Sequence, residues 1–238
     1  MGLQGTFTSG GLGFEVWPGA QVFATWLLEG ELGIHVRNKD VLELGAGCGL
    51  AGVLTAIFAK SVVMTDGEVA LTPTLEQNRS EAKMGAHMAS VLQPALVLRW
   101  GGETPDLYTP VEADGVLVTG DLDRDRKLHF GSREADELGT YEVIIAADII
   151  YHTGHIATAI VTDIIPRYLK LDGRFFLVIP PERDGSDDFL QAAREAEAQE
   201  RISMTVERAP RHYIPQQFRD KLDAGVGFRL VTIQRRDK

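Results

Sequence analysis

Apolar residues are grouped along the chain in short blocks that favour strands and helices in turn. Short, mainly apolar segments predict five buried strands, at 40–44, 61–66, 95–100, 141–148 and 174–180. Apolar residues at helical spacing predict helices at 18–29, 49–59, roughly 69–84 and 155–170. Strands that alternate with helices are typical of a parallel sheet with helices on both faces, so we expect a doubly wound α/β fold.

The C-terminal part of the chain departs from this alternation. A last helix is predicted to begin at Ser186, with this serine as its N-cap and Asp187 and Asp188 in the first turn. Two strands follow at 202–209 and 225–235, with no helix pattern between them. That arrangement predicts an antiparallel pair at the edge of the sheet, which brings the expected total to seven strands, mostly parallel.

Two segments fit the pattern less well than the rest of a single domain at 17–238. Residues 1–16 are rich in glycine, and we expect them to form a flexible arm. The stretch 101–140 carries ten Asp or Glu residues against four Lys or Arg residues. We favour an irregular acidic insertion there, although the segment "GVLVTGDLDRDRKLHFG" also permits a short extra hairpin.

The amino-acid composition indicates the cellular compartment and the kind of partner to expect. No run approaches 18 apolar residues, the N-terminus lacks a signal-peptide pattern, and the only cysteine, Cys48, has no disulfide partner. We therefore expect a soluble protein of the cytoplasm, with the nucleus as the other possible compartment and no membrane association. A net charge of −10 disfavours nucleic acid as a partner and favours a basic one, such as a lysine-bearing protein segment.

The glycine-rich loop "DVLELGAGCGL" follows the first strand, where a nucleotide usually binds. Its glycines fit the dinucleotide pattern G-x-G-x-x-G only if that pattern begins at Gly47, two residues later than a strand ending at Leu44 predicts. The pattern E-x-G-x-G-x-G instead matches at every position, from Glu43 to Gly49. A carboxylate at this point repels a diphosphate and suits a ligand with an amino group and a sulfonium, which is S-adenosylmethionine.

A carboxylate at the tip of the second strand supports the same ligand. Asp66 can accept hydrogen bonds from both ribose hydroxyls, as the acidic residue of a dinucleotide fold does. The glycines let the backbone approach the amino-acid and ribose portions, where a Cβ would collide. Both groups are predicted to lie at the carboxyl ends of the strands, near the topological switch point.

Four motifs in order, "VLELGAGCGLAG", "VMTDGE", "LRWGG" and "IIAADIIY", together resemble methyltransferase family 16. These are seven-strand, Rossmann-like class I methyltransferases that mostly modify protein lysines, and the likeness runs from about Trp17 to Pro181. It implies S-adenosylmethionine as cofactor. It also implies that the cofactor contacts are the residues Trp17, Gly45, Ala46, Gly47, Asp66, Trp100 and Ala147.

The most specific of the four motifs is D-x-x-Y, formed by Asp148 and Tyr151 after the fourth strand. Methyl transfer from a sulfonium needs no nucleophilic side chain and no metal, so positioning can supply most of the catalysis. A lysine acceptor must lose its proton first, since roughly one in 2,500 is neutral at pH 7. A carboxylate favours the charged ammonium, so it does not help the proton to leave. We therefore predict that Asp148 captures and aims the acceptor, with the proton lost to water, and that Tyr151 shapes its channel.

Three other functions stay open at this stage. The same fold accommodates a small-molecule N-methyltransferase, a non-catalytic cofactor-binding adaptor, or an NAD-dependent oxidoreductase. His152 and His155 lie three residues apart, but without a third ligand at suitable spacing they do not indicate a metal site. No motif of the chain identifies the substrate protein or decides between lysine, histidine and arginine as the acceptor. The degree of methylation and the oligomeric state are likewise not encoded in a motif.

Overall fold

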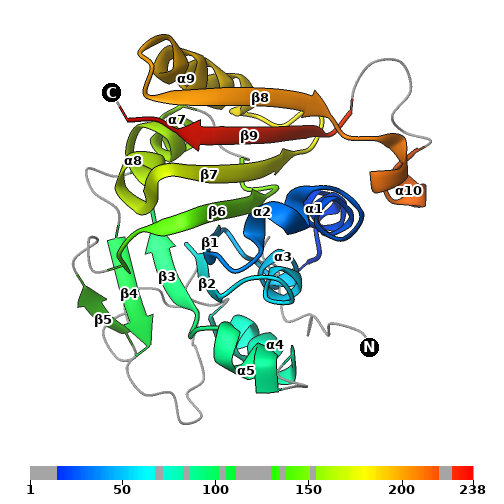
Figure 1. The fold of residues 1–238 in the computed structure, drawn as a ribbon, viewed down its shortest axis with the longest axis vertical. Helices are drawn as coiled ribbons and strands as arrows, with labels where there is room; N and C mark the ends of the chain where they lie inside the picture. Colours follow the sequence, from blue (N-terminus) through cyan, green and yellow to red (C-terminus); the bar gives the residue numbers. More distant parts are fainter. Residues whose placement is uncertain are drawn as a thin grey trace.

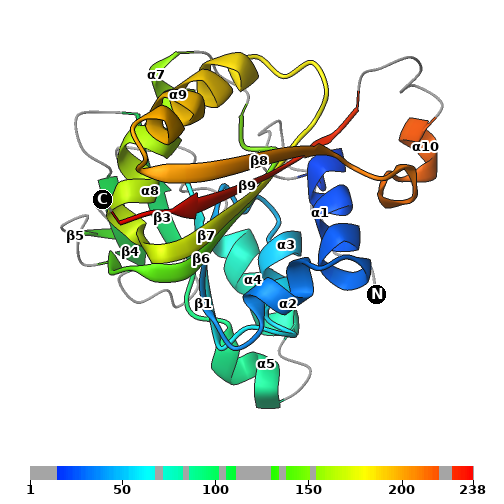
Figure 2. The same cartoon turned by 45° about the horizontal axis from the view of Figure 1, so that its top comes forward.

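One mixed β-sheet runs through the molecule, with helices on both of its faces (Figures 1 and 2). A computed structural model describes residues 15–67, 72–82, 86–101, 106–110, 130–133, 138–150, 154–219 and 227–237. Within these ranges the sheet has nine strands in the order β5-β4-β3-β2-β1-β6-β7-β9-β8. The strands are β1 (Asp40–Leu44), β2 (Ser61–Asp66), β3 (Leu96–Arg99), β4 (Asp106–Pro110), β5 (Phe130–Arg133), β6 (Tyr141–Ala147), β7 (Leu169–Ile179), β8 (Ile202–Arg208) and β9 (Arg229–Arg235).

The seven predicted strands are all present with the predicted orientations. β3, β2, β1, β6 and β7 are parallel neighbours, whereas β9 pairs antiparallel with both β7 and β8. Two further strands extend the sheet beyond β3, because β4 and β5 pair antiparallel within the 101–140 stretch. Residues 111–129 between them lie outside the described residues, as do residues 1–14 of the predicted N-terminal arm.

Each face of the sheet has its own hydrophobic core, because side chains along a strand point alternately to opposite sides. Leu42 and Leu44 of β1 belong to the core beneath α7 (His155–Ala159), α8 (Ile165–Tyr168) and α9 (Ser186–Ala198). Val41 belongs to the opposite core, beneath α1 (Pro18–Glu29), α2 (Leu32–Val36), α3 (Leu50–Thr55), α4 (Thr72–Ala82) and α5 (Ala86–Val91). Glu43 shares the side of Val41, so a carboxyl is buried in an apolar layer.

The predicted helices begin close to their predicted positions, but α2 and α5 were not predicted and α3 ends at Thr55 rather than Ala59. Three further differences concern the C-terminal half of the chain. The helix predicted at 155–170 contains a π-helical segment, η4 (Ile160–Ile164), and gives way to β7 at Leu169. The N-cap of α9 is Gly185, at φ +80°, and the prediction of Ser186 was wrong because the Ser186 hydroxyl is buried without a hydrogen-bond partner. Between β8 and β9 lie two short helical turns, η5 (Arg211–Tyr213) and α10 (Gln216–Arg219).

The start of α1 is important for the site because it is held close to the end of β6. Pro18 occupies the first helical turn, where its missing N–H costs nothing. Gly19 follows, and a Cβ there would lie 2.8 Å from the Cβ of Asp148. Val22, Phe23, Trp26 and Leu27 are buried as their spacing predicts, so they anchor the helix to the sheet. None of the described helices is both long and apolar enough to span a bilayer.

Candidate active site

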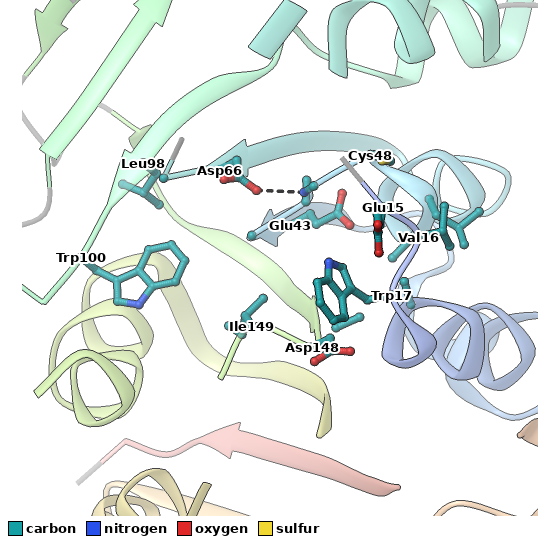
Figure 3. A pocket seen from close by; sticks show the side chains of 18 of the residues that line it. Glu15, Val16, Trp17, Glu43, Cys48, Asp66, Leu98, Trp100, Asp148 and Ile149 are labelled. Atoms are coloured by element: carbon teal, nitrogen blue, oxygen red, sulfur yellow. Dashed lines mark hydrogen bonds between the residues drawn. The ribbon is translucent and has the colours of Figure 1, made fainter. Parts of the chain in front are cut away.

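A cavity of about 520 Å³ opens at the carboxyl ends of β1, β2, β3 and β6 (Figure 3). It lies beside the point where the chain order changes direction, since β2 and β6 flank β1 on opposite sides. Nine of the predicted site residues line this cavity: Trp17, Glu43, Gly45, Ala46, Gly47, Asp66, Trp100, Ala147 and Asp148. The tenth, Tyr151, lies outside the described residues, and so does His152.

The glycine loop forms the floor of the cavity, with a backbone that only glycine adopts readily. Gly45, Gly47 and Gly49 have φ values of +59°, +52° and +79°, in the left-handed region. A Cβ at Gly45 would also lie 2.5 Å from Ile149 Cγ2. The loop is tied to α4 by a hydrogen bond of 2.8 Å from Asn78 Nδ2 to the carbonyl oxygen of Cys48. The loop is therefore held close to the cavity without side chains that would fill it.

Glu43 places a carboxyl group with unusual electrostatics at the end of β1. The residue is 3% exposed, and its Oε2 atom is buried without a hydrogen-bond partner. The pKa of Glu43 is raised to about 8, mainly by burial and in smaller part by the negative charge of Asp66, whereas the Gly52 N–H opposes the shift. This carboxyl is thus mostly protonated at neutral pH. A cation brought beside it would favour ionisation and supply the partner that Oε2 lacks.

Asp66 and Trp100 line two other sides of the cavity. Asp66 Oδ2 accepts a hydrogen bond of 2.8 Å from the N–H of Gly47, so the tip of β2 and the glycine loop are fixed to each other (Figure 3). Trp100 follows β3, and its Nε1 atom is buried without a partner. Ala147, the last residue of β6, also lines the cavity, and its small side chain leaves space at the cavity wall.

Asp148 follows Ala147 in a strained position, with φ at +63°. Aspartate tolerates this left-handed conformation better than most residues. Its Oδ2 accepts a hydrogen bond of 3.3 Å from the N–H of Gly19, at the start of α1. Burial raises the pKa of Asp148, although the positive charge of Arg183 acts in the opposite direction. The carboxyl is therefore held by the fold from two sides rather than exposed to solvent.

Arg183 is the residue that the sequence motifs did not single out. It lies in the segment between β7 and α9 and lines the cavity. Its Nη2 lies 2.7 Å from Asp148 Oδ1, and its Cζ lies 5.1 Å from the centre of the Trp17 ring. Glu15, Ile149 and Ile156 also line the cavity without having been predicted. Ile149 closely follows β6, but Glu15 precedes α1 and Ile156 lies in α7, so no shared sequence signal selected them.

Two other predicted properties concern Cys48 and metal binding. Cys48 is buried, and burial together with nearby carboxylates raises the pKa of its thiol, so a thiolate nucleophile is disfavoured. Among the described residues, no group of three His, Cys, Asp or Glu side chains is arranged to hold a metal ion.

The comparisons with known proteins agree with this architecture. Protein N-lysine methyltransferase METTL21A of Xenopus tropicalis is 30% identical over 142 residues, covering 59% of this chain and 49% of the relative. Histone-arginine methyltransferase METTL23 of Xenopus laevis is 36% identical over 108 residues, covering 44% and 42%. The chain thus spans about half the length of the curated relatives it matches.

A solved structure and a family model also match this chain. A TehB-like SAM-dependent methyltransferase from Corynebacterium glutamicum superposes with a TM-score of 0.52 at 14% identity, over 93% of this chain and 89% of that one. That likeness supports the class I methyltransferase fold. A family model described as lysine methyltransferase matches residues 4–122, half of the 238-residue chain. This protein therefore belongs to the lysine methyltransferase family.

Proposed function

We propose that this protein is an S-adenosylmethionine-dependent methyltransferase whose acceptor is a lysine side chain of another protein. One observation carries the proposal: a glycine cradle and two carboxyl groups, Glu43 and Asp66, face the same cavity at the carboxyl ends of the strands. Family membership supports the reaction, and the names of the METTL21A relatives support lysine as acceptor. The METTL23 relative is named for arginine, which makes arginine the alternative acceptor.

The cavity fits the cofactor by shape and by charge. A volume of about 520 Å³ is typical of a small-ligand site. The unpartnered Glu43 Oε2 suits the ligand's amino group, Asp66 suits its ribose hydroxyls, and the indole of Trp100 suits its adenine. A nicotinamide dinucleotide carries no aliphatic ammonium that would ionise Glu43 and pair with it. The buried carboxyl therefore favours S-adenosylmethionine over that cofactor.

The protein's own residues then have to position an acceptor nitrogen. When bound, S-adenosylmethionine supplies a methyl group on a sulfonium, which leaves readily. Asp148 lies at the edge of the cavity, near Trp17 (Figure 3), so the acceptor side chain is expected to enter there. Apolar walls from Ile149 and Ile156 exclude water and favour the neutral amine. The predicted contribution of Tyr151 is part of the proposal, although it lies outside the described residues.

The domain organisation, the cellular compartment and the class of partner are also part of the proposal. We assign residues 17–238 to one domain and place the protein in the cytoplasm or nucleus, where Cys48 stays reduced. The net charge of −10 favours a basic protein segment over nucleic acid as a partner.

Two experiments test the proposal. In a thermal-shift assay, S-adenosylhomocysteine should raise the melting temperature and NAD should not, because only the former pairs an amino group with Glu43. In a second assay, the protein is incubated with S-adenosylmethionine labelled on its methyl group and a cell lysate, and the labelled protein is analysed by mass spectrometry. Stabilisation by NAD alone would overturn the cofactor assignment. Label found only on small metabolites would overturn the protein acceptor.

A further inference from the structure

Three segments far apart in the sequence meet at the edge of the cavity and surround one positive charge. Arg183 donates from Nε and Nη2 to Asp148 Oδ1, at 2.9 Å and 2.7 Å. The guanidinium carbon also lies 5.1 Å from the centre of the Trp17 ring, within the range of a cation–π contact. A carboxylate and an aromatic face thus bind the same cation.

The burial of the two partners shows which of them covers the other. The side chain of Asp148 is 1% exposed, whereas that of Arg183 is 27% exposed. Asp148 Oδ2 is occupied by the N–H of Gly19 on the inner side, and Arg183 lies on Oδ1. Because Arg183 is on the more exposed side, a group arriving from solvent reaches this carboxylate only by taking its place.

Arg183 is also attached in a way that permits displacement. It comes from the turns between β7 and α9 rather than from a helix or strand, and it follows Glu182, whose φ is +57°. Arg183 contacts Asp148 and the Trp17 ring, so an incoming cation that makes the same two contacts can replace it. By contrast, Asp148 and Trp17 stand directly after β6 and directly before α1. The two groups that bind the cation are therefore placed by regular elements, whereas the cation is not.

We infer that Asp148 and Trp17 form the subsite for the cationic side chain of the acceptor, and that Arg183 fills this subsite until an acceptor displaces it. The inference rests on the proposed function, because it assigns the entrance of the same cavity. A lysine ammonium belongs to the chemical class that a carboxylate and an indole face bind together. Exchange of one cation for another leaves the buried carboxylate paired throughout, which avoids the cost of an isolated buried charge.

The test removes the resident cation and supplies a free one. The Arg183→Ala variant should bind n-butylammonium, which has the length and charge of a lysine side chain. For a Kd on the order of 10 mM, about 50 mM n-butylammonium should raise its melting temperature by roughly 2–4 °C. The wild-type protein should show no such rise, because its tethered Arg183 competes. If Arg183→Ala does not fold, Arg183→Ser replaces it with the same expected outcomes.

Three controls make the result specific. Equal concentrations of sodium chloride and 1-butanol separate ionic strength and apolar filling from cation binding, and neither should stabilise Arg183→Ala. The Arg183→Ala/Asp148→Asn double variant lacks the carboxylate and should not respond to n-butylammonium. Arg167→Ala removes an arginine that is 28% exposed and pairs with Asp163, a carboxylate that is 26% exposed rather than buried, and it should not respond either.

Some results would overturn the inference and leave the proposed function intact. These are a folded Arg183→Ala protein that n-butylammonium does not stabilise, or an equal response in either control variant. S-adenosylhomocysteine is titrated into the wild-type protein in parallel, without n-butylammonium. Absence of binding in that titration would count against the proposed function instead, so the two failures are distinguishable.

Discussion

Binding of the cofactor should release a proton from Glu43, and this prediction follows from the burial of its carboxyl. With a pKa of about 8, the group is protonated in roughly nine molecules of ten at pH 7. A ligand ammonium placed beside it would lower that pKa by about two units, as nearby opposite charges commonly do. The carboxyl would then be mostly ionised in the complex. We therefore expect Glu43 to release about 0.8 proton per S-adenosylhomocysteine bound at pH 7 and about 0.1 at pH 9. This contribution is the difference between the wild type and Glu43→Gln, because proton uptake by the ligand's own amino group occurs in both.

Isothermal titration calorimetry measures this number directly. The binding enthalpy is determined in buffers of different ionisation enthalpy, and its slope gives the protons exchanged. The Glu43→Gln variant serves as the control, because its side chain does not titrate and any remaining slope belongs to the ligand. An identical slope for wild type and Glu43→Gln at pH 7 would refute the reasoning and remove Glu43 from contact with the amino group.

The same carboxyl also predicts how stability depends on pH. Because the pKa of Glu43 is higher in the folded protein than its ordinary value of 4.5, the unfolded chain ionises first as pH rises. The empty protein should therefore lose stability from about pH 4.5 to pH 8, by on the order of 5 kcal/mol at most. In chemical denaturation, the free energy of unfolding of Glu43→Gln relative to that of the wild type should rise steadily across this range. At pH 4 the difference should show no such rise. A constant difference between the two proteins would contradict the assignment.

Three substitutions test the rest of the site. Gly45→Ala adds a Cβ at φ +59° and 2.5 Å from Ile149 Cγ2, so its melting temperature should fall by roughly 3–6 °C and S-adenosylhomocysteine binding should be lost. Gly139→Ala is its control, with a φ of +75° but no atom within 4 Å, and it should bind the ligand normally. Asp66→Asn should weaken binding by roughly 10- to 100-fold in calorimetry, because an ionised acceptor for the ribose is lost while the amide oxygen can still accept from the loop. Asp148→Asn should abolish labelling of the lysate protein while the ligand's Kd stays within a few-fold, and normal labelling would exclude Asp148 from acceptor capture.

The order of strands and helices could be predicted from the sequence because it depends on local patterns. Apolar runs located seven of the nine strands of the sheet, and the glycine loop identified the end of the sheet where the cavity lies. Glu43 was recognised from the glycine-loop pattern and Asp66 from its place at the end of the second strand, whereas Trp100 was implied by the family resemblance. The sequence permitted a short hairpin in this stretch but did not locate β4 and β5, because residues 111–129 separate the two strands and no local pattern encodes pairing over that distance.

Only the tertiary structure decided the charges and partners at the site. Asp148 is joined to Gly19 across 129 residues and to Arg183 across 35, and no local pattern encodes contacts of that range. The raised pKa of Glu43 likewise depends on the apolar layer around it and on the nearby Asp66, which approach it only in the folded chain. Local periodicity therefore determined where the chemistry-bearing residues stand along the chain. Burial and long-range pairing determined the protonation of Glu43 and the pairing of Asp148.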